Sequence, residues 1–284
     1  MTAAAGLPQD LRLALDAAAG RLRPFFGLVS AFDLVGSTND EAARLAALGA
    51  DEGTLVLADA QSGGRGRSGR SWFSPPGAGL YVSVVLRPAT DEDPSRPVEW
   101  LRLITLAAGV AVAEGIRAAT ALPVELKWPN DVVLSEARGP RAADRRWRKL
   151  AGILAEASAV GSAVQHVIVG IGINVSQAAF PPEISGHATS LEAEIGRPVD
   201  RGTVLVEILA ALRARYDDLR QGRARRVLDR WRELAPAATG ARVAVASEGG
   251  TREGVTAGLG EDGSLNVRLG ERTESIVAGD LTWT

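Results

Sequence analysis

The sequence predicts an α+β fold, in which a mixed β-sheet with flanking helices over residues 1–235 precedes a small all-β module over residues 236–284. Two observations predict this arrangement. Several strand-like segments follow one another without an intervening helix, which excludes the regular alternation of a parallel, doubly wound sheet. After residue 235 the chain changes to short strands separated by Gly and Asp turns, a pattern that is typical of a small all-β unit.

The first half of the chain predicts three helices and two strands. Residues 9–22 are amphipathic, and residues 37–50 begin with Ser or Thr, continue with acids and then place apolar residues at helical spacing. The β-rich segment 54–60 runs directly into a stretch of glycines and arginines, and a proline stops the strand predicted over 79–88. Residues 100–120 predict a long, largely buried helix.

The second half begins with three strand-like segments, at 124–128, 149–158 and 166–175. Two charged amphipathic helices follow, at about 201–220 and 223–234. Because no helical pattern separates the three strands, this region is the main reason to expect a mixed sheet.

The composition limits the function classes. Apolar residues make up 46% of the 284 residues and charged residues 23%, as in an ordinary globular enzyme. A net charge of −2 gives no overall attraction to nucleic acid or to an anionic membrane. The sequence has no cysteine, which excludes thiol catalysis, disulfides and Cys-type zinc sites and fits a cytoplasmic protein.

Targeting and metal signals are weak. The N-terminus has no apolar core like that of a signal peptide, and we find no run that approaches the ~20 apolar residues of a membrane span. The two histidines are too few for a His-rich metal site. We expect His187 to be solvated and His166 to lie near the start of a strand.

The segment 61–72, QSGGRGRSGRSW, is named the arginine loop here because glycines alternate with Arg65, Arg67 and Arg70. It fits the pattern G-x-G-x-x-G, but that fingerprint needs a helix after the third glycine, and tandem prolines follow instead. A P-loop is excluded because no G-K-[ST] follows. Glycine N–H groups and arginine side chains together favour a mobile loop that orders over a phosphorylated ligand, rather than a solvated hairpin.

The stretch ELKWPNDVVL places Lys127 and Trp128 at the end of a strand, with Asn130 and Asp131 where the next strand begins. An amine, an amide and a carboxylate in one place suit a nucleoside triphosphate with magnesium. The alternative is a surface lysine before an ordinary Pro-Asn-Asp turn.

Two further stretches have simpler interpretations. GSTNDEA, residues 36–42, is a helix cap. In VGIGINV, residues 169–175, Gly170 and Gly172 permit close approach to a buried strand, and Asn174 provides an amide at its end that could recognise a base or a ring.

Taken together, GSTN, QSGGRGRSGRSWFSP, KWPNDV with KLAGILAE, and GIGINV, in this order and before a β module, closely resemble the bacterial biotin protein ligases. The resemblance covers roughly residues 30–284. It implies a class II synthetase-like ligase domain followed by an SH3-like barrel. It also implies an enzyme that uses magnesium ATP to convert biotin into biotinyl-5′-AMP. The biotinyl group then passes to a lysine of the biotin carboxyl carrier domain of an acyl-CoA carboxylase.

The resemblance also implies roles for individual residues. Lys127 would lie between the biotin carboxylate and the α-phosphate, where a cation stabilises charge in phosphoryl transfer. Arg65 and Arg67 would close over the reacting groups, and these two residues with Lys127 form the predicted catalytic set. The predicted biotin site consists of Ser37, Thr38, Asn39, Gln61, Arg65, Gly66, Arg67 and Lys127. The predicted ATP site consists of Arg67, Trp72, Lys127, Trp128, Asn130, Asp131 and Asn174, with Trp72 beside the adenine, and metal ligands are not identified.

Three features depart from the family pattern. Residues 135–149 form an insertion with six basic residues, which we interpret as a solvated, partly disordered hairpin tip rather than a nucleic-acid patch. Residues 176–189 would form a second mobile loop, in which Phe180 could cover the adenine. GSTN begins at residue 36, which leaves no room for the winged-helix domain of some family members, so no specific DNA binding is expected.

The sequence leaves the quaternary structure open between a monomer and a homodimer. A lipoyl or octanoyl transferase of the same fold is the nearest alternative, and the combination of GRGR with KWPND argues against it. A non-catalytic protein that binds nucleotides or RNA through the arginine loop is an alternative of another class.

Overall fold

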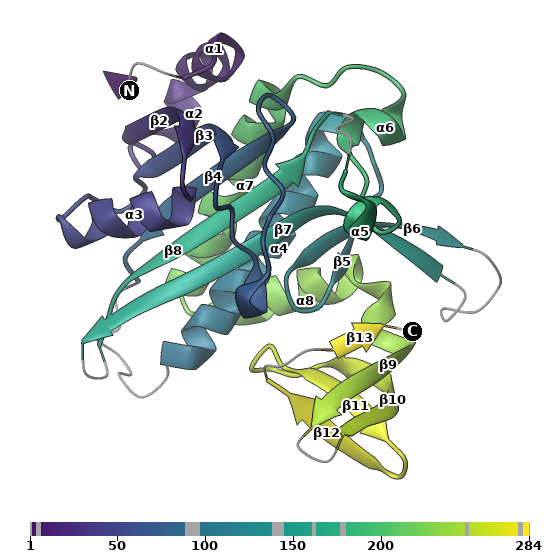
Figure 1. The fold of residues 1–284 in the computed structure, drawn as a ribbon. Helices are drawn as coiled ribbons and strands as arrows, with labels where there is room; N and C mark the ends of the chain where they lie inside the picture. The colour runs from purple at the N-terminus through teal and green to yellow at the C-terminus, as the bar shows by residue number, and fades with distance from the viewer. Residues whose placement is uncertain are drawn as a thin grey trace.

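The computed structural model describes residues 2–3, 7–88, 97–137, 145–160, 163–176, 180–247, 250–277 and 281–283. Within them, an eight-stranded mixed sheet forms the larger part of the protein and a five-stranded antiparallel sheet the C-terminal part (Figure 1). The predicted α+β fold class, a mixed sheet with flanking helices, is therefore confirmed. The second sheet is consistent with an SH3-like domain, and the domain boundary at residue 235 stays a prediction.

The larger sheet has the strand order β1-β2-β3-β4-β8-β7-β6-β5. Its strands are β1 (Thr2–Ala3), β2 (Leu28–Val35), β3 (Leu55–Gln61), β4 (Gly79–Leu86), β5 (Glu125–Lys127), β6 (Asp131–Ala137), β7 (Arg145–Val160) and β8 (Ala163–Asn174). The pairs β1–β2 and β2–β3 are parallel and all the others antiparallel. The sequence analysis omits β2, because the exposed Leu28 and Leu34 obscure its alternation of apolar and polar residues.

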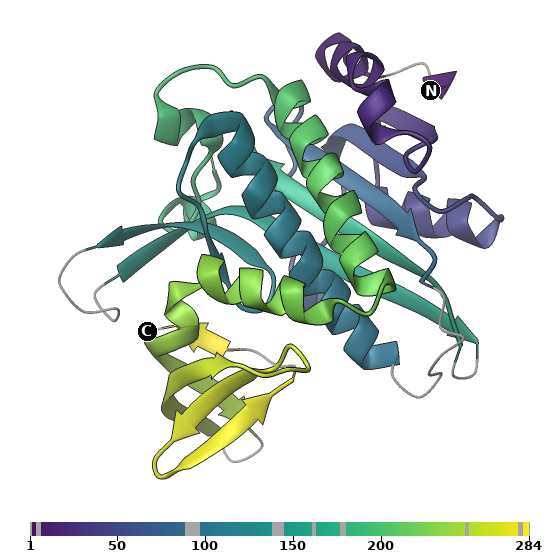
Figure 2. The same ribbon diagram turned by 180° about the vertical axis from the view of Figure 1, so that it is seen from behind.

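The helices in the described residues are α1 (Gln9–Ala17), α2 (Ala19–Leu22), α3 (Thr38–Ala47), α4 (Pro97–Thr120), α5 (Pro182–Ser185), α6 (Leu191–Ile195), α7 (Arg201–Arg220) and α8 (Ala224–Leu234). Two short 3-10 turns, η1 (Arg67–Gly69) and η3 (Pro236–Ala238), accompany them. Helices α4 and α7 lie side by side across one face of the sheet (Figure 2). The segment between β3 and β4 crosses the opposite face of the sheet (Figure 1).

Helix α4 is the centre of the core. Its residue Gly115 has no room for a side chain, since a Cβ would lie 2.4 Å from Ile208 of α7, so the two helices approach closely. The segment Trp100–Thr120 is long and apolar enough to cross a membrane by length and composition, which contradicts the expectation that no run approaches this size. In the protein, 67% of the apolar 18-residue window within this segment is buried, as in a core helix.

The C-terminal sheet has the strand order β12-β11-β10-β9-β13. Its strands are β9 (Thr239–Ser247), β10 (Gly250–Leu259), β11 (Leu265–Leu269), β12 (Arg272–Ile276) and β13 (Leu281–Trp283). The turn between β10 and β11 attaches this sheet to the larger part. Trp128 Nε1 donates a 3.1 Å hydrogen bond to the carbonyl of Gly263, and Arg102 pairs with Asp262 at 2.7 Å.

Candidate functional site

A pocket of about 420 Å³ lies on the sheet face opposite α4 and α7, and it brings the sequence motifs together. Every residue that the sequence analysis assigns to biotin or to ATP lines this pocket. Its walls come from the start of α3, the arginine loop, the turn between β5 and β6, the middle of β7 and the C-terminal end of β8. The structure thus places all the predicted site residues together, while their individual roles remain predictions.

One end of the pocket is polar and fixed by hydrogen bonds. Ser37, Thr38 and Asn39 are buried where α3 begins. The Thr38 N–H donates to Gln61 Oε1 at 2.8 Å, and Gln61 Nε2 donates to Ser74 Oγ at 2.9 Å. Because these groups already hold one another in place, a ligand meets donors and acceptors with fixed directions.

Two glycines of β8 make room for this end and for the aromatic wall beside it. A Cβ on Gly170 would lie 2.1 Å from Asn39 Oδ1, and a Cβ on Gly172 would lie 2.5 Å from the Trp72 ring. Both distances are far too short for carbon contacts, so any larger residue would displace Asn39 or Trp72. The close approach predicted from GIGINV is confirmed, with side chains rather than backbone as the approaching groups.

The Trp72 ring contacts both Gly172 and Gly152 of the sheet. A Cβ on Gly152 would lie 3.0 Å from the ring. Its indole nitrogen is buried and has no hydrogen-bond partner among the described residues. A buried donor without a partner costs about 1–3 kcal/mol. A Cβ on Gly172 would lie 2.5 Å from this nitrogen, so β8 covers the N–H group and the Trp72 ring forms an aromatic wall of the pocket.

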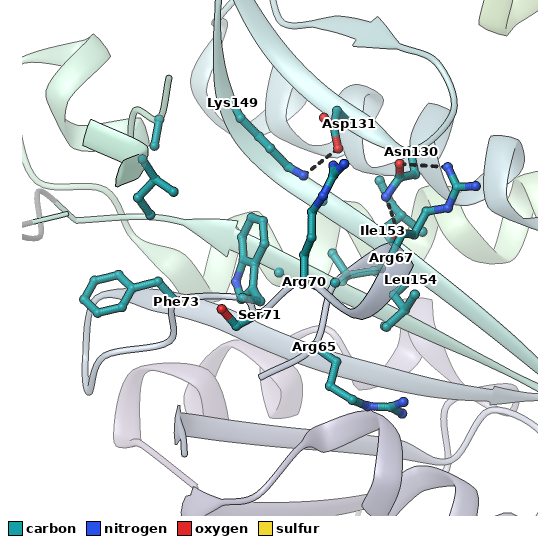
Figure 3. Close-up of a pocket in the computed structure, with 18 of the residues that line it drawn as sticks. Arg65, Arg67, Arg70, Ser71, Phe73, Asn130, Asp131, Lys149, Ile153 and Leu154 are labelled. Atoms are coloured by element: carbon teal, nitrogen blue, oxygen red, sulfur yellow. Dashed lines mark hydrogen bonds and ion pairs between the residues drawn. The ribbon is translucent and has the colours of Figure 1, made fainter. Parts of the chain in front are cut away.

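The arginines of the arginine loop point in different directions (Figure 3). Arg65 turns away from the other two and pairs through one nitrogen with Asp40 and Glu156, each at 2.7 Å. Arg67 extends to the other side and donates to Asn130 Oδ1 at 3.4 Å. Arg65 therefore anchors the loop to the protein, whereas Arg67 bridges the loop to the turn after β5.

Two lysines form the cationic part of the pocket. Lys149, at the pocket end of β7, lies 2.6 Å from Asp131 Oδ1 and 5.2 Å from the centre of the Trp72 ring. Lys127 Nζ lies 5.3 Å from the ring centre of Trp147 and 5.6 Å from that of Trp283. Burial lowers the pKa of Lys127, and the nearby Lys149 ammonium lowers it further, while Asp131 opposes the shift.

The sequence analysis missed four residues at or behind the pocket: Lys149, Ser83, Glu156 and Trp283. Ser83 is fully buried in β4, and a lone serine within the apolar run GLYVSVVL was a usable signal. Lys149 opens the motif KLAGILAE, which the sequence analysis used as a strand and for the family resemblance without assigning a site residue in it. Nothing in the sequence indicates that Trp283 lines a pocket formed mostly by residues 37–188.

Other predicted residues have structural partners of their own. The indole of Trp128 is almost fully buried and bonded to Gly263. Asn174 Nδ2 donates to the carbonyl of Thr189 at 2.9 Å. The ring of Phe180 lies 6.5 Å from that of Phe73, at the pocket rim.

The two histidines behave as expected in part. His187 is exposed, and its carbonyl accepts from the Lys149 N–H. His166 is buried in β8, three residues after its start, and burial with the nearby Arg87 cation lowers its pKa. Neither imidazole is shown at the centre of the pocket.

A metal ion has little direct support from protein ligands. Among the described residues, no group of three or more His, Cys, Asp or Glu side chains could hold a metal. Asp131 is the one acidic side chain among the described residues that line the pocket, and it already pairs with Lys149. Magnesium would fit here only if most of its oxygen ligands came from bound phosphates and water.

The insertion at 135–149 lengthens the hairpin of β6 and β7, which pair as far as Ala137 and Arg145. The expected tip, residues 138–144, lies outside the described residues. At the base of this hairpin, the Trp147 ring lies 5.7 Å from the Trp283 ring of β13. The insertion and the C-terminal sheet therefore meet beside Lys127.

Comparison with known proteins gives consistent results. Residues 32–174 match the biotin/lipoate A/B protein ligase family. The chain is 35% identical over 251 residues to the bifunctional ligase/repressor BirA of Bacillus spizizenii, covering 88% of this chain and 72% of that protein. It is 37% identical over 253 residues to the biotin–[acetyl-CoA-carboxylase] ligase of Mycobacterium tuberculosis, covering 87% and 85% of the two chains. The fold is similar to that of the biotin protein ligase from Aquifex aeolicus in complex with biotin and ATP, with a TM-score of 0.74, 30% identity and coverage of 91% and 99%.

Proposed function

Because the chain belongs to the biotin/lipoate A/B protein ligase family, we propose that it is a biotin–protein ligase that activates biotin with ATP and transfers the biotinyl group to a carrier protein. One observation carries the proposal. A single pocket joins a polar end, where hydrogen bonds hold Thr38 to Gln61 and Asn39 to Glu156, to a cationic end with Lys127 and Lys149. Biotin has the same polarity, since a ureido ring and a carboxylate lie at its two ends.

The reaction has two steps. A carboxylate oxygen of biotin attacks the α-phosphorus of ATP, a new C–O–P linkage forms, and pyrophosphate leaves. The amine of a carrier lysine then attacks the acyl carbon, an amide forms, and AMP leaves. The first step brings two anions together, so the main task of the chain is to supply positive charge and orientation.

The individual roles are proposals that the geometry supports. Ser37, Thr38, Asn39 and Gln61 bind the ureido ring, and Trp72 covers the apolar part of biotin or the adenine. We assign Lys127 to the carboxylate and the α-phosphate, as the sequence predicts. Lys149 lies next to Trp72 and Gly152, so we add it to the same cationic centre.

The nucleotide side consists of the turn after β5 and the end of β8. Asn130 is held by its donation to the carbonyl of Ile153 at 2.7 Å and accepts from Arg67. This contact supports our proposal that the arginine loop covers the phosphates of ATP. Magnesium, which offsets charge on the phosphates when bound, would arrive with ATP, and Asp131 is the carboxylate that could contribute an oxygen ligand.

The partner that this function requires is a biotin carboxyl carrier domain, and the relatives named biotin–[acetyl-CoA-carboxylase] ligases favour an acyl-CoA carboxylase. We place the enzyme in the cytoplasm, as a monomer or homodimer, and propose no specific DNA binding for residues 1–284. These finer points rest on the sequence analysis.

One experiment tests the function. The protein is incubated with biotin, magnesium ATP and a purified carrier domain, and mass spectrometry is expected to show one added biotinyl group on the carrier. Biotin-dependent exchange of pyrophosphate into ATP tests the first step alone. Transfer of lipoate or octanoate in place of biotin would favour the alternative activity of the same fold, and no acyl transfer would contradict both.

A further inference from the structure

We propose that Glu156 is a positioning residue that couples the arginine loop to the polar end of the pocket. The proposal rests on the proposed function, since it concerns how that site recognises biotin. Glu156 lies on β7 behind the pocket and does not line it. It acts through the side chains that it holds.

A single oxygen of Glu156 accepts hydrogen bonds from two different parts of the site. Glu156 Oε2 lies 2.7 Å from Asn39 Nδ2, in the predicted biotin site, and 2.7 Å from Arg65 Nη2, in the arginine loop. A carboxylate that accepts a charged donor forms a stronger bond than a neutral acceptor. The position of Arg65 therefore depends on the position of Asn39, although the two side chains meet only through Glu156.

The second partner of Arg65 has a smaller effect by the same reasoning. Asp40 Oδ1 also lies 2.7 Å from Arg65 Nη2, but the Asp40 side chain is 64% exposed and that of Glu156 is 37% exposed. Solvent screens an exposed ion pair more strongly. In addition, Glu156 is bonded to the nearly fully buried Asn39, which limits its movement.

From Asn39 the hydrogen bonds continue along the floor of the pocket and return to the arginine loop. The Ser83 hydroxyl donates to Asn39 Oδ1 at 2.6 Å and lies 2.8 Å from Thr38 Oγ1. The Thr38 hydroxyl in turn donates to Gln61 Oε1 at 3.1 Å, and Gln61 Nε2 donates to Ser74 Oγ.

The last member of this series closes it. Ser74 Oγ donates to the carbonyl of Trp72 at 3.1 Å, and Trp72 ends the arginine loop. The series thus begins at Arg65, within the arginine loop, and finishes at Trp72, the last residue of the loop. Because bonded groups in such a series orient one another, a ligand that fixes the polar end also fixes the loop.

The first test measures loop order without any ligand. Arg65, Arg67 and Arg70 are trypsin sites, so the rate of tryptic cleavage within the loop reports how often it opens. Glu156→Ala is expected to raise this rate about three- to tenfold in the absence of biotin. Glu156→Gln, which keeps an acceptor oxygen and loses the charge, should restore part of the protection.

Glu41→Ala is the matched control, because Glu41 pairs with Arg44 on the same helix, α3, and not with the loop. Its cleavage rate within the loop should equal that of wild type. If Glu156→Ala is cleaved no faster than Glu41→Ala, the proposed anchoring is wrong. The melting temperature, measured by circular dichroism, distinguishes general unfolding from loop opening. If Glu156→Ala only opens the loop, its melting temperature stays close to that of wild type while the cleavage rate rises.

The second test measures the coupling directly. Biotin affinity is determined by calorimetry for Asn39→Ala, Arg65→Ala and the double variant, first with Glu156 present and then in Glu156→Ala protein. With Glu156 present, the biotin dissociation constant of the double variant should differ by about threefold or more from the value expected if the two single-variant effects were independent. Without Glu156, the two effects should multiply independently.

Two outcomes contradict the proposal: additive effects when Glu156 is present, or an unchanged coupling when it is removed. Failure of the proposed function looks different. In that case wild-type protein binds no biotin, while the tryptic test still decides whether Glu156 anchors the loop.

Discussion

At the scale of single residues, the shape of the pocket depends on two glycines of β8 that carry no side chain. Gly170 and Gly172 leave the space that Asn39 and Trp72 occupy, and each of these side chains lies where a β-carbon would otherwise be. The chemistry then depends on charge, which two lysines and the arginine loop supply. Small changes at these positions should change ligand binding before they change folding.

Gly170→Ala should weaken biotin binding by about tenfold or more, because overpacking costs typically ~1–3 kcal/mol and the new methyl would displace Asn39. Calorimetry gives the affinity, and a thermal melt shows whether the fold survives. Gly20→Ala is the control, since a Cβ there meets nothing within 4 Å and alanine suits its helix. Wild-type affinity in Gly170→Ala would show that Asn39 does not position biotin.

The charge of Lys127 should be lost at a lower pH than that of an ordinary lysine. Burial lowers its pKa from 10.5, so the ammonium deprotonates, and adenylate formation falls, as pH rises through this lowered value. The measurement is kcat/KM for biotin against pH, which reports the free enzyme. Lys127→Arg should move the alkaline limb to higher pH; an identical limb in that variant would exclude Lys127 as its cause.

Removing the charges separately distinguishes the two lysines. Lys127→Gln and Lys149→Gln keep a polar side chain, and each should lower the rate of adenylate formation by orders of magnitude with the fold intact. Biotin-dependent pyrophosphate exchange measures this step. A near wild-type rate in Lys127→Gln, with a large loss in Lys149→Gln, would move the predicted role from the first lysine to the second.

The sequence predicts a site residue where that residue lies within a recognisable short motif. Thr38, Gln61 and Lys127 were all predicted for the site, and the structure brings them to one pocket. Glu156 was not predicted, because its importance comes from partners that lie 91 and 117 positions away in sequence. A single sequence carries no record of such pairings.

At the scale of elements, the arginine loop contributes two kinds of contact. Arg65 holds it to α3 and β7 on one side, and Arg67 reaches Asn130 on the other. Biotinyl-AMP is a mixed anhydride that reacts with amines it meets, so a ligase has to retain it until the carrier arrives, and we propose that the arginine loop does this. Arg67 lies on the side where the phosphate is proposed to bind.

Arg67→Gly should release the adenylate early, because the contact to Asn130 is lost and glycine adds backbone entropy to the open loop. The adenylate still forms, but bystander proteins such as albumin become biotinylated, which streptavidin blotting detects. Arg44→Ala, on the exposed face of α3, is the control and should label no bystander. Normal adenylate formation without extra labelling in Arg67→Gly would exclude a retaining role.

Among the elements, β3, β4, β7, β8, α4, α7 and α8 were predicted within a few residues of their observed bounds. These segments have strong apolar patterns or clear stops, and local pattern is what a sequence records. Strand β2 was missed because apolar residues lie on both of its faces. The insertion proved to extend β6 and β7, which its basic composition did not indicate.

At the scale of the whole molecule, the C-terminal sheet contributes to the site as well as to the fold. Its strand β13 supplies Trp283 and Leu281 to the pocket. The turn near Gly263 fixes the sheet to Trp128 and α4. The sequence predicted an all-β module here, but its docking beside the pocket depends on tertiary contacts that no local pattern records.

Trp283→Ala should raise the KM for ATP severalfold and leave biotin affinity nearly unchanged. The variant loses the ring contact with Trp147 and one of the two rings beside Lys127, while the polar end of the pocket lies elsewhere. Steady-state pyrophosphate exchange at varied ATP measures the KM, and calorimetry measures biotin binding. Thr282→Ala, an exposed neighbour on β13, is the control; equal KM values in the two variants would remove Trp283 from the site.

The position of Trp283 near the end of the sequence determines when the pocket wall becomes complete during synthesis. Ribosomes add about 5–20 residues per second, so Trp283 is made roughly 12–50 s after Ser37, although both line the same pocket. During that interval a growing chain can already carry the motifs that bind biotin, but the wall beside Lys127 is missing. An acyl-adenylate that formed on a growing chain would therefore have no complete chamber until synthesis has passed residue 283.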